Sequence, residues 1–268
     1  MSPPGGTARF VIDKISLDQI GSVIGSKFGG EFKMEADTTS KPQLPLLQHV
    51  PSGHRFLYIP GGRFEMGFSD SEERAAKTIF DPIPANIGEM RPLKSEQVLP
   101  FLMAERPILT REIAGHQSSH PDAAAYVSYE EAVAYSRGFG MTLASESQWE
   151  YACRAGTSTL FTFGDQLPND EELAEWLTFD FSRGNGRANA FGLHGLFVGE
   201  WCLDLFTNSY ELNADLSTDG STRVVRGGGA YFWPWQDQEW VWCMSAMRCP
   251  STDLPEAKCS FRLVRNLS

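Results

Sequence analysis

Residues 143–157 read Leu-Ala-Ser-Glu-Ser-Gln-Trp-Glu-Tyr-Ala-Cys-Arg-Ala-Gly-Thr, the most strongly patterned stretch of this 268-residue chain. Ser145 and Gln148 have the spacing of a capping box, which predicts that a helix begins after the serine. Trp149 and Cys153 lie four residues apart, so the same face of that helix is expected to be buried. The Ala-Gly pair after Arg154 predicts where the helix ends.

A second helix is predicted upstream, in Val-Ser-Tyr-Glu-Glu-Ala-Val-Ala-Tyr-Ser-Arg-Gly at residues 127–138. Ser128 and Glu131 form another capping box, and Gly138 predicts the end of the helix. Phe-Leu-Tyr-Ile-Pro-Gly-Gly-Arg-Phe-Glu-Met-Gly at residues 56–67 is typical of two strands joined as a hairpin. The remaining sequence is rich in turns, so we expect an α+β fold with two main helices and short antiparallel strands.

The N-terminal residues differ from the rest and are assigned to a separate unit, 1–45, before a domain at 46–268. Ser16 to Lys27 predicts a short amphipathic helix that ends at Gly29-Gly30, and Lys33 to Pro45 is typical of a linker. Two interpretations of residues 1–45 are open. The segment is either a strap over the domain or a separate binding element.

Composition restricts the possible partners and the compartment. The formal net charge of −11 argues against binding to nucleic acid or to anionic membranes, because like charges repel. The N-terminus has no signal-peptide pattern and no apolar run reaches the ~18 residues of a membrane span, so we expect a cytoplasmic protein. Five cysteines, an odd number without a CxxC pair, indicate reduced thiols.

Seven motifs follow one another in an order that resembles the formylglycine-generating-enzyme (sulfatase-modifying factor) family. They are the hairpin segment 59–67, the helix start 127–132, the stretch 143–157, Asn-Ala-Phe-Gly-Leu at 189–193, Glu-Trp-Cys-Leu-Asp at 200–204, Arg-Gly-Gly-Gly at 226–229, and the closing pair Met247-Arg248 and Phe261-Arg262-Leu263. The resemblance implies an elaborated C-type-lectin-like domain. We expect Trp149 to be buried, and Arg154, Arg248 and Arg262 to bridge loops by hydrogen bonding.

The resemblance also implies copper, held in the namesake enzymes by two cysteines shortly after the Arg-Gly-Gly turn, for the oxidation of a peptide cysteine by oxygen. Here residues 230–237 contain no cysteine. Because copper(I) requires soft thiolate ligands, no copper is expected at the family position. Cys243 and Cys249, six residues apart, are candidate catalytic residues as a re-registered thiolate pair. The alternative is that one is a core residue and the other a loop thiol.

A related branch of the family holds iron through three histidines. His116 and His120 have a helical spacing, and His49 is a possible third ligand, but Pro121 and Gly115 flank the pair and disfavour a helix there. We therefore favour polar loop positions for His116 and His120.

Calcium is the third metal that the resemblance implies, in the loop before Glu-Trp. The loop from His194 to Trp201 is two residues shorter than the family pattern, and Gly195 replaces an Asp or Asn ligand. Glu200 is the one candidate metal ligand that remains, whereas calcium prefers six to eight oxygens. The alternative role for Glu200 is hydrogen bonding to backbone amides.

The segment from Tyr231 to Trp242 contains four of the seven tryptophans of the chain. If they are exposed, an aromatic surface for a protein or small-molecule ligand would be formed by Tyr231, Trp233, Trp235, Trp240 and Trp242. Alternatively, their strand-like spacing directs alternate residues into a core. Three hypotheses follow: a non-catalytic binding or regulatory module, a divergent metal-dependent oxygen-using oxidase, and a structural subunit that docks through its N-terminal segment.

Overall fold

The computed structural model describes residues 10–35, 44–116, 119–169, 171–172, 188–211, 220–228 and 237–267. The helices are α1 Leu17–Phe28, α2 Asp70–Ala76, α3 Tyr129–Gly138 and α4 Glu146–Arg154, with 3-10 turns η1 Ile87–Met90, η2 Thr110–Glu112 and η4 Asp237–Cys243. The strands are β1 Phe10–Ile12, β2 Phe32–Met34, β3 Leu46–His49, β4 Arg55–Ile59, β5 Gly62–Met66, β6 Lys94–Val98, β7 Phe101–Ala104, β8 Glu200–Leu205, β9 Thr222–Arg226, β10 Arg248–Thr252 and β11 Val264–Asn266.

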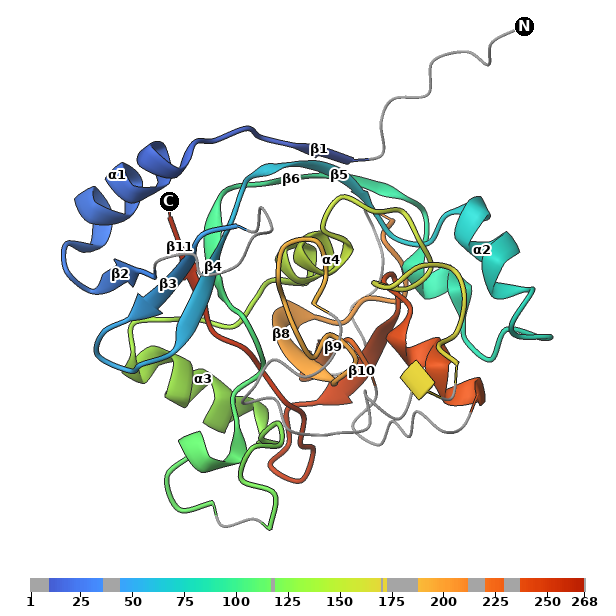
Figure 1. Ribbon diagram of the computed structural model, residues 1–268. Helices are drawn as coiled ribbons and strands as arrows, with labels where there is room; N and C mark the ends of the chain where they lie inside the picture. The colour runs from blue at the N-terminus through green and yellow to red at the C-terminus, as the bar shows by residue number, and fades with distance from the viewer. Residues whose placement is uncertain are drawn as a thin grey trace, which may run out of the picture.

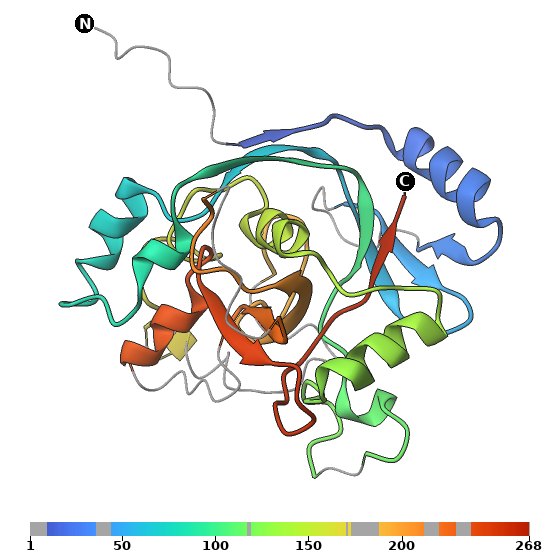
Figure 2. The same ribbon diagram turned by 180° about the vertical axis from the view of Figure 1, so that it is seen from behind.

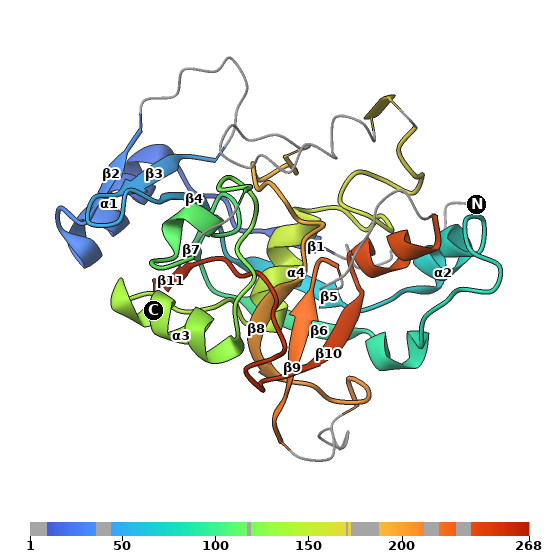
Figure 3. The same cartoon turned by 90° about the horizontal axis from the view of Figure 1, so that it is seen from below.

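These strands form three antiparallel sheets, in the orders β1-β5-β6, β10-β9-β8 and β11-β7-β4-β3-β2. Helix α4 lies in the middle of the molecule, between the arch of β5 and β6 and the β8-β9-β10 sheet (Figures 1 and 2). Helices α1 and α2 lie at opposite ends (Figure 3). None of the helices within the described ranges is long and apolar enough to cross a membrane. The expected α+β fold is confirmed.

Both main helices begin and end as predicted. Ser128 and Ser145 accept the backbone N–H groups of the third residue in α3 and α4, and both capping boxes are complete. Helix α4 ends at Ala155, whose φ of 45° places it in the left-handed region. Trp149 and Cys153 are buried as predicted, each 1% exposed. The helix is nevertheless buried on most sides rather than on one face, since Glu146, Glu150 and Arg154 are buried too.

The predicted hairpin at residues 56–67 is wrong. Strand β4 pairs with β3 and β7, whereas β5 pairs with β1 and β6. Each strand already has a partner at both edges, so the two cannot pair with each other. The Pro60-Gly61 turn instead carries the chain from one sheet to another.

The N-terminal segment contributes to two of these sheets. Strand β1 pairs with β5, and β2, which begins just before the predicted linker, pairs with β3. Ser16 caps α1 through a complete capping box, and Ile20 and Ile24 of this helix are buried in the main core. Residues 10–35 therefore pack as part of the described fold.

Replacing Gly62 with alanine is expected to detach β1. A Cβ at this position would collide with the Val11 carbonyl oxygen and lie 2.6 Å from the Tyr151 hydroxyl, and overpacking of this kind costs about 1–3 kcal/mol. Faster proteolysis near the N-terminus would report the detachment. In the control Gly30→Ala, an added Cβ has no neighbour within 4 Å, so the rate of proteolysis should be unchanged. Equal rates of proteolysis in the two variants would contradict the prediction.

Candidate functional site

The glycine turn after β9 is held tightly by the scaffold. Gly227 and Gly228 have φ of 92° and 155°, a region that favours glycine. A Cβ on Gly227 would lie 2.6 Å from the Val198 carbonyl oxygen and 2.7 Å from the Trp149 ring. The turn thus fixes the point at which the chain leaves β9 for residues 229–236, which lie outside the described residues.

Cys243, one of the two predicted catalytic thiols, faces this turn from η4. Its Sγ lies 3.6 Å from the Gly227 carbonyl oxygen and 3.9 Å from that of Phe197, so the thiol donates to backbone acceptors. Burial raises the pKa of Cys243 well above its ordinary value. Burial likewise raises the pKa of Cys249, on β10, to about 12. Both thiols are therefore protonated near neutral pH, whereas nucleophiles and copper ligands are thiolates.

All five thiols are expected to react slowly in the folded chain. Burial raises the pKa of Cys153, Cys249 and Cys259 to about 12, and that of Cys202 and Cys243 well above its usual range. At pH 8 we expect alkylation by iodoacetamide to be at least about a hundredfold slower than in urea, because the thiolate is the reactive form. The rate should rise about tenfold per pH unit up to pH 10. Rapid alkylation of one cysteine at neutral pH, detected by mass spectrometry, would instead identify an activated thiolate.

Glu200, the predicted metal ligand, forms a buried ion pair. Its Oε1 lies 2.5 Å from Nη2 of Arg262, and its Oε2 lies 2.6 Å from Nε of the same arginine and 3.1 Å from Nε1 of Trp149. The side chain is fully buried. A calcium ion does not fit here, because both oxygens already face donors and a guanidinium would repel it. The alternative of hydrogen bonds to backbone amides is also wrong, since the carboxylate accepts from the side chains of Trp149 and Arg262.

The expected exposure of Trp240 is also wrong. Trp240 is 2% exposed and packs edge-on against Phe161 and Phe163. Trp242 is half-buried beside the same cluster. The reason is local: residues 237–243 form the helical turn η4, so strand-like alternation does not apply. Three predicted ligand-binding residues lie outside the described residues: Tyr231, Trp233 and Trp235.

The histidines do not assemble as an iron site. His49 is 2% exposed, and its Nδ1 lies 2.7 Å from the Ser52 hydroxyl while its ring packs against Phe32. His116 and His120 lie in the loop after η2 rather than on one helix face. Over the residues that the structure describes, no group of three or more His, Cys, Asp and Glu side chains could hold a metal ion.

Sequence reasoning missed a buried network of ion pairs on α4. Glu146 accepts from Nε of Arg248 at 2.8 Å and from Nη1 of Arg226 at 3.0 Å. Glu150 accepts from Nη2 of Arg226 at 2.5 Å and from Nε of Arg154 at 2.8 Å. The four-residue spacing of Glu146, Glu150 and Arg154 was the signal that could have placed all three on one face of the helix.

The motif arginines bridge loops as predicted. Arg248 donates to the carbonyl oxygens of Glu89 and Thr207, at 3.0 and 2.9 Å. Arg154 donates to the Gly67 carbonyl oxygen, and Arg262 to that of His194, both at 3.0 Å. These motif residues therefore hold the scaffold together.

Comparisons with known proteins agree with the fold. The family model of the sulfatase-modifying factor enzyme 1-like domain matches residues 41–267. The formylglycine-generating enzyme of Mus musculus is 32% identical over an alignment of 135 positions that covers 42% of this chain and 36% of that protein. That of Streptomyces coelicolor is 30% identical over an alignment of 146 positions that covers 46% of each chain. The matched region thus spans less than half the length of these curated relatives.

Two solved structures share the architecture. PvdO from Pseudomonas aeruginosa matches with a TM-score of 0.59 at 19% identity, covering 85% of this chain and 100% of that one. Treponema denticola variable protein 1 matches with a TM-score of 0.52 at 15% identity, covering 87% and 98%. At such identities the likeness establishes the fold alone.

Proposed function

Since this chain belongs to the sulfatase-modifying factor enzyme 1-like family, we propose that it uses the family scaffold as a binding or regulatory module. Its ligand is a protein or a small molecule, and formylglycine generation is not its activity. The observation that carries this proposal is the state of the thiols. Residues 230–237 contain no cysteine, and Cys243, the nearest one, is a buried, protonated donor to backbone carbonyls.

The proposed binding segment runs from residue 229 to Trp242. It follows the glycine turn at Gly227-Gly228, where backbone and Trp149 contacts permit no side chain. It ends at η4, where Trp240 is anchored in the core. The described residues on either side, Gly228 and Trp240, are thus held by the scaffold. The candidate contact residues are Tyr231, Trp233, Trp235 and Trp242, because aromatic side chains provide much of the energy at binding interfaces.

Metal analysis combined with a binding assay tests the proposal. The purified chain is expected to contain no stoichiometric copper after copper(I) loading and to produce no aldehyde in a cysteine-containing peptide. In quantitative affinity capture, Trp235→Ala should lose a partner that the wild type retains. Leu254→Ala, at an exposed position (56% exposed) outside the segment, is the matched control. Copper at one ion per chain with aldehyde formation would overturn the proposal.

A metal-dependent oxygen-using oxidase with a re-registered site is the second candidate. One observation favours it: Cys153 and Cys249 lie near enough to Cys243 to add to the burial that raises its pKa. On this alternative, a soft metal would bind the Cys243 thiol after it loses its proton. Stoichiometric copper that disappears in Cys243→Ser would support the oxidase, whereas the same metal content in wild type and variant would exclude this site.

A further inference from the structure

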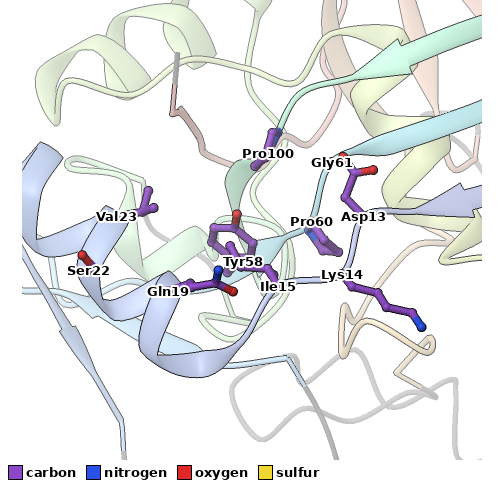
Figure 4. A pocket seen from close by; sticks show the side chains of 10 residues that line it. All are labelled: Asp13, Lys14, Ile15, Gln19, Ser22, Val23, Tyr58, Pro60, Gly61 and Pro100. Atoms are coloured by element: carbon purple, nitrogen blue, oxygen red, sulfur yellow. The ribbon is translucent and has the colours of Figure 1, made fainter.

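A pocket of about 380 Å³ lies between the N-terminal segment and the turn that joins β4 to β5 (Figure 4). Ile15 and Val23 line it from the N-terminal side, and Tyr58, Pro60 and Pro100 line it from the sheet side. Its volume is in the range of small-molecule sites, which combine an apolar lining with a few placed polar groups. The sequence pattern gave no indication of it, because its two sides are more than 30 residues apart.

Tyr58 contributes a hydroxyl to this mixed lining, which also includes the polar residues Gln19 and Ser22. The residue is 1% exposed, and over the described ranges its hydroxyl has no hydrogen-bond partner although it is not sealed from solvent. Burial, with a smaller contribution from the negative charge of Asp13, raises the pKa of Tyr58. The hydroxyl is therefore neutral at physiological pH and can both donate and accept. A buried hydroxyl that lacks a protein partner gains free energy when a ligand supplies one.

Asp13 supplies a negative charge to the lining of this pocket. Its backbone N–H donates to the Gly61 carbonyl oxygen at 2.8 Å, which fixes the residue at the rim. Its carboxylate lies against the turn, with Oδ2 3.1 Å from where a Cβ on Gly61 would be, and it forms no ion pair with any described residue. The amine of Lys14, by contrast, extends away from Tyr58 (Figure 4). Asp13 is thus the charged residue of this lining whose charge acts on the Tyr58 hydroxyl.

We propose that this pocket binds a small organic amine. The protonated amine donates to the Asp13 carboxylate and to the Tyr58 hydroxyl oxygen, and the apolar body of the ligand contacts Ile15, Val23 and Pro100. The N-terminal side of the pocket comes from residues 13–23, which precede the matched family region 41–267. Tyr58, Pro60, Gly61 and Pro100, on the other side, lie within the matched region, and the site does not depend on the proposed role of residues 229–242.

Three probes that share an apolar body test the proposal: 2-phenylethylamine, 2-phenylethanol and 3-phenylpropanoate. Dissociation constants are measured with the full chain by two-dimensional NMR titration. We expect the amine to bind about tenfold more tightly than the alcohol, and the carboxylate to bind more weakly than either. Shifts should be largest for the amides of Asp13 to Val23 and of Gly61. Equal affinity for the three probes, or no binding of the amine at 20 mM (roughly the limit for a fragment of this size), would overturn the proposal.

Two isosteric variants separate the contributions. Asp13→Asn should lower the affinity for the amine about tenfold and leave the alcohol unchanged, because only the charge is lost. Tyr58→Phe should weaken the amine and the alcohol severalfold. Asp18→Asn, which changes a carboxylate on α1 outside the pocket, is the matched control and should have no effect. An unchanged amine affinity in Asp13→Asn would contradict the proposed contact between the amine and the Asp13 carboxylate. If Tyr58→Phe folds poorly, the three probes measured on the wild type still test the proposal.

Discussion

Glu150→Gln is expected to lower the free energy of unfolding by about 3–5 kcal/mol, the usual cost of removing one partner of a buried ion pair. The Glu150 carboxylate is fully buried and accepts from Nη2 of Arg226, Nε of Arg154 and the Gly67 N–H. An amide retains the shape but leaves two guanidinium groups without their full counter-charge. Urea denaturation followed by tryptophan fluorescence measures the change.

The same carboxylate predicts a dependence on pH. Burial alone would raise the pKa of Glu150, but Arg154 and Arg226 outweigh burial and hold its pKa below the ordinary value of 4.5. A group with a lowered pKa in the folded state stabilises the fold above its unfolded pKa, and this contribution is lost as the pH falls below it. We therefore expect stability to decline below about pH 4.5 in the wild type, and less steeply in Glu150→Gln.

The matched control for this substitution is Glu130→Gln, on the exposed face of α3. Surface changes of this kind are usually within about 0.5 kcal/mol. If Glu150→Gln lowered the free energy of unfolding no more than Glu130→Gln, the buried ion pairs of α4 would contribute little to stability. The view that they hold the scaffold together would then be wrong.

The second large effect is expected at Glu200 and Arg262. Either Glu200→Met or Arg262→Met leaves one buried charge without its partner and should cost about 3–5 kcal/mol. The double variant should cost less than the sum of the two, by about 0.5–3 kcal/mol, because it removes both charges together. Urea denaturation of the four proteins completes the double-mutant cycle.

The exposed pair Arg55 and Glu35 provides the comparison. Their side chains are 45% and 33% exposed, and surface pairs of this kind contribute at most about 1 kcal/mol. The Glu200–Arg262 cycle should therefore yield the larger coupling energy. Strict additivity at Glu200 and Arg262 would mean that the two charges do not stabilise each other in the folded chain.

The sequence predicted those features that depend on residues close together in the chain. The starts of α3 and α4 followed from Ser128 and Ser145, because a capping box is complete within four residues. The order of the motifs predicted the family, and hence the fold, since the family model matches residues 41–267. The bridging role of the arginines was expected from their many hydrogen-bond donors. The residues that accept these hydrogen bonds could not be predicted.

The errors arose where tertiary pairing overrides local pattern. The segment 56–67 looks like a hairpin, yet the edges of β4 and β5 are occupied by strands that are distant in sequence. Glu200 looked like a metal ligand because Arg262, its partner, is 62 residues away. Trp240 turned inward because residues 237–243 form a 3-10 turn rather than a strand. None of these partners is visible from local spacing.

The position of α4 has a consequence for biosynthesis. Its acidic residues Glu146 and Glu150 emerge from the ribosome long before Arg226 and Arg248, and Arg248 contacts Glu146 across 102 residues. Until those arginines are synthesised, burial of the helix would leave Glu146 without a cationic partner and Glu150 with Arg154 alone, so early closure of the centre is disfavoured. Contacts of this separation slow folding, and a ribosome-bound chain that stops at residue 220 should remain open to proteases and to chaperones.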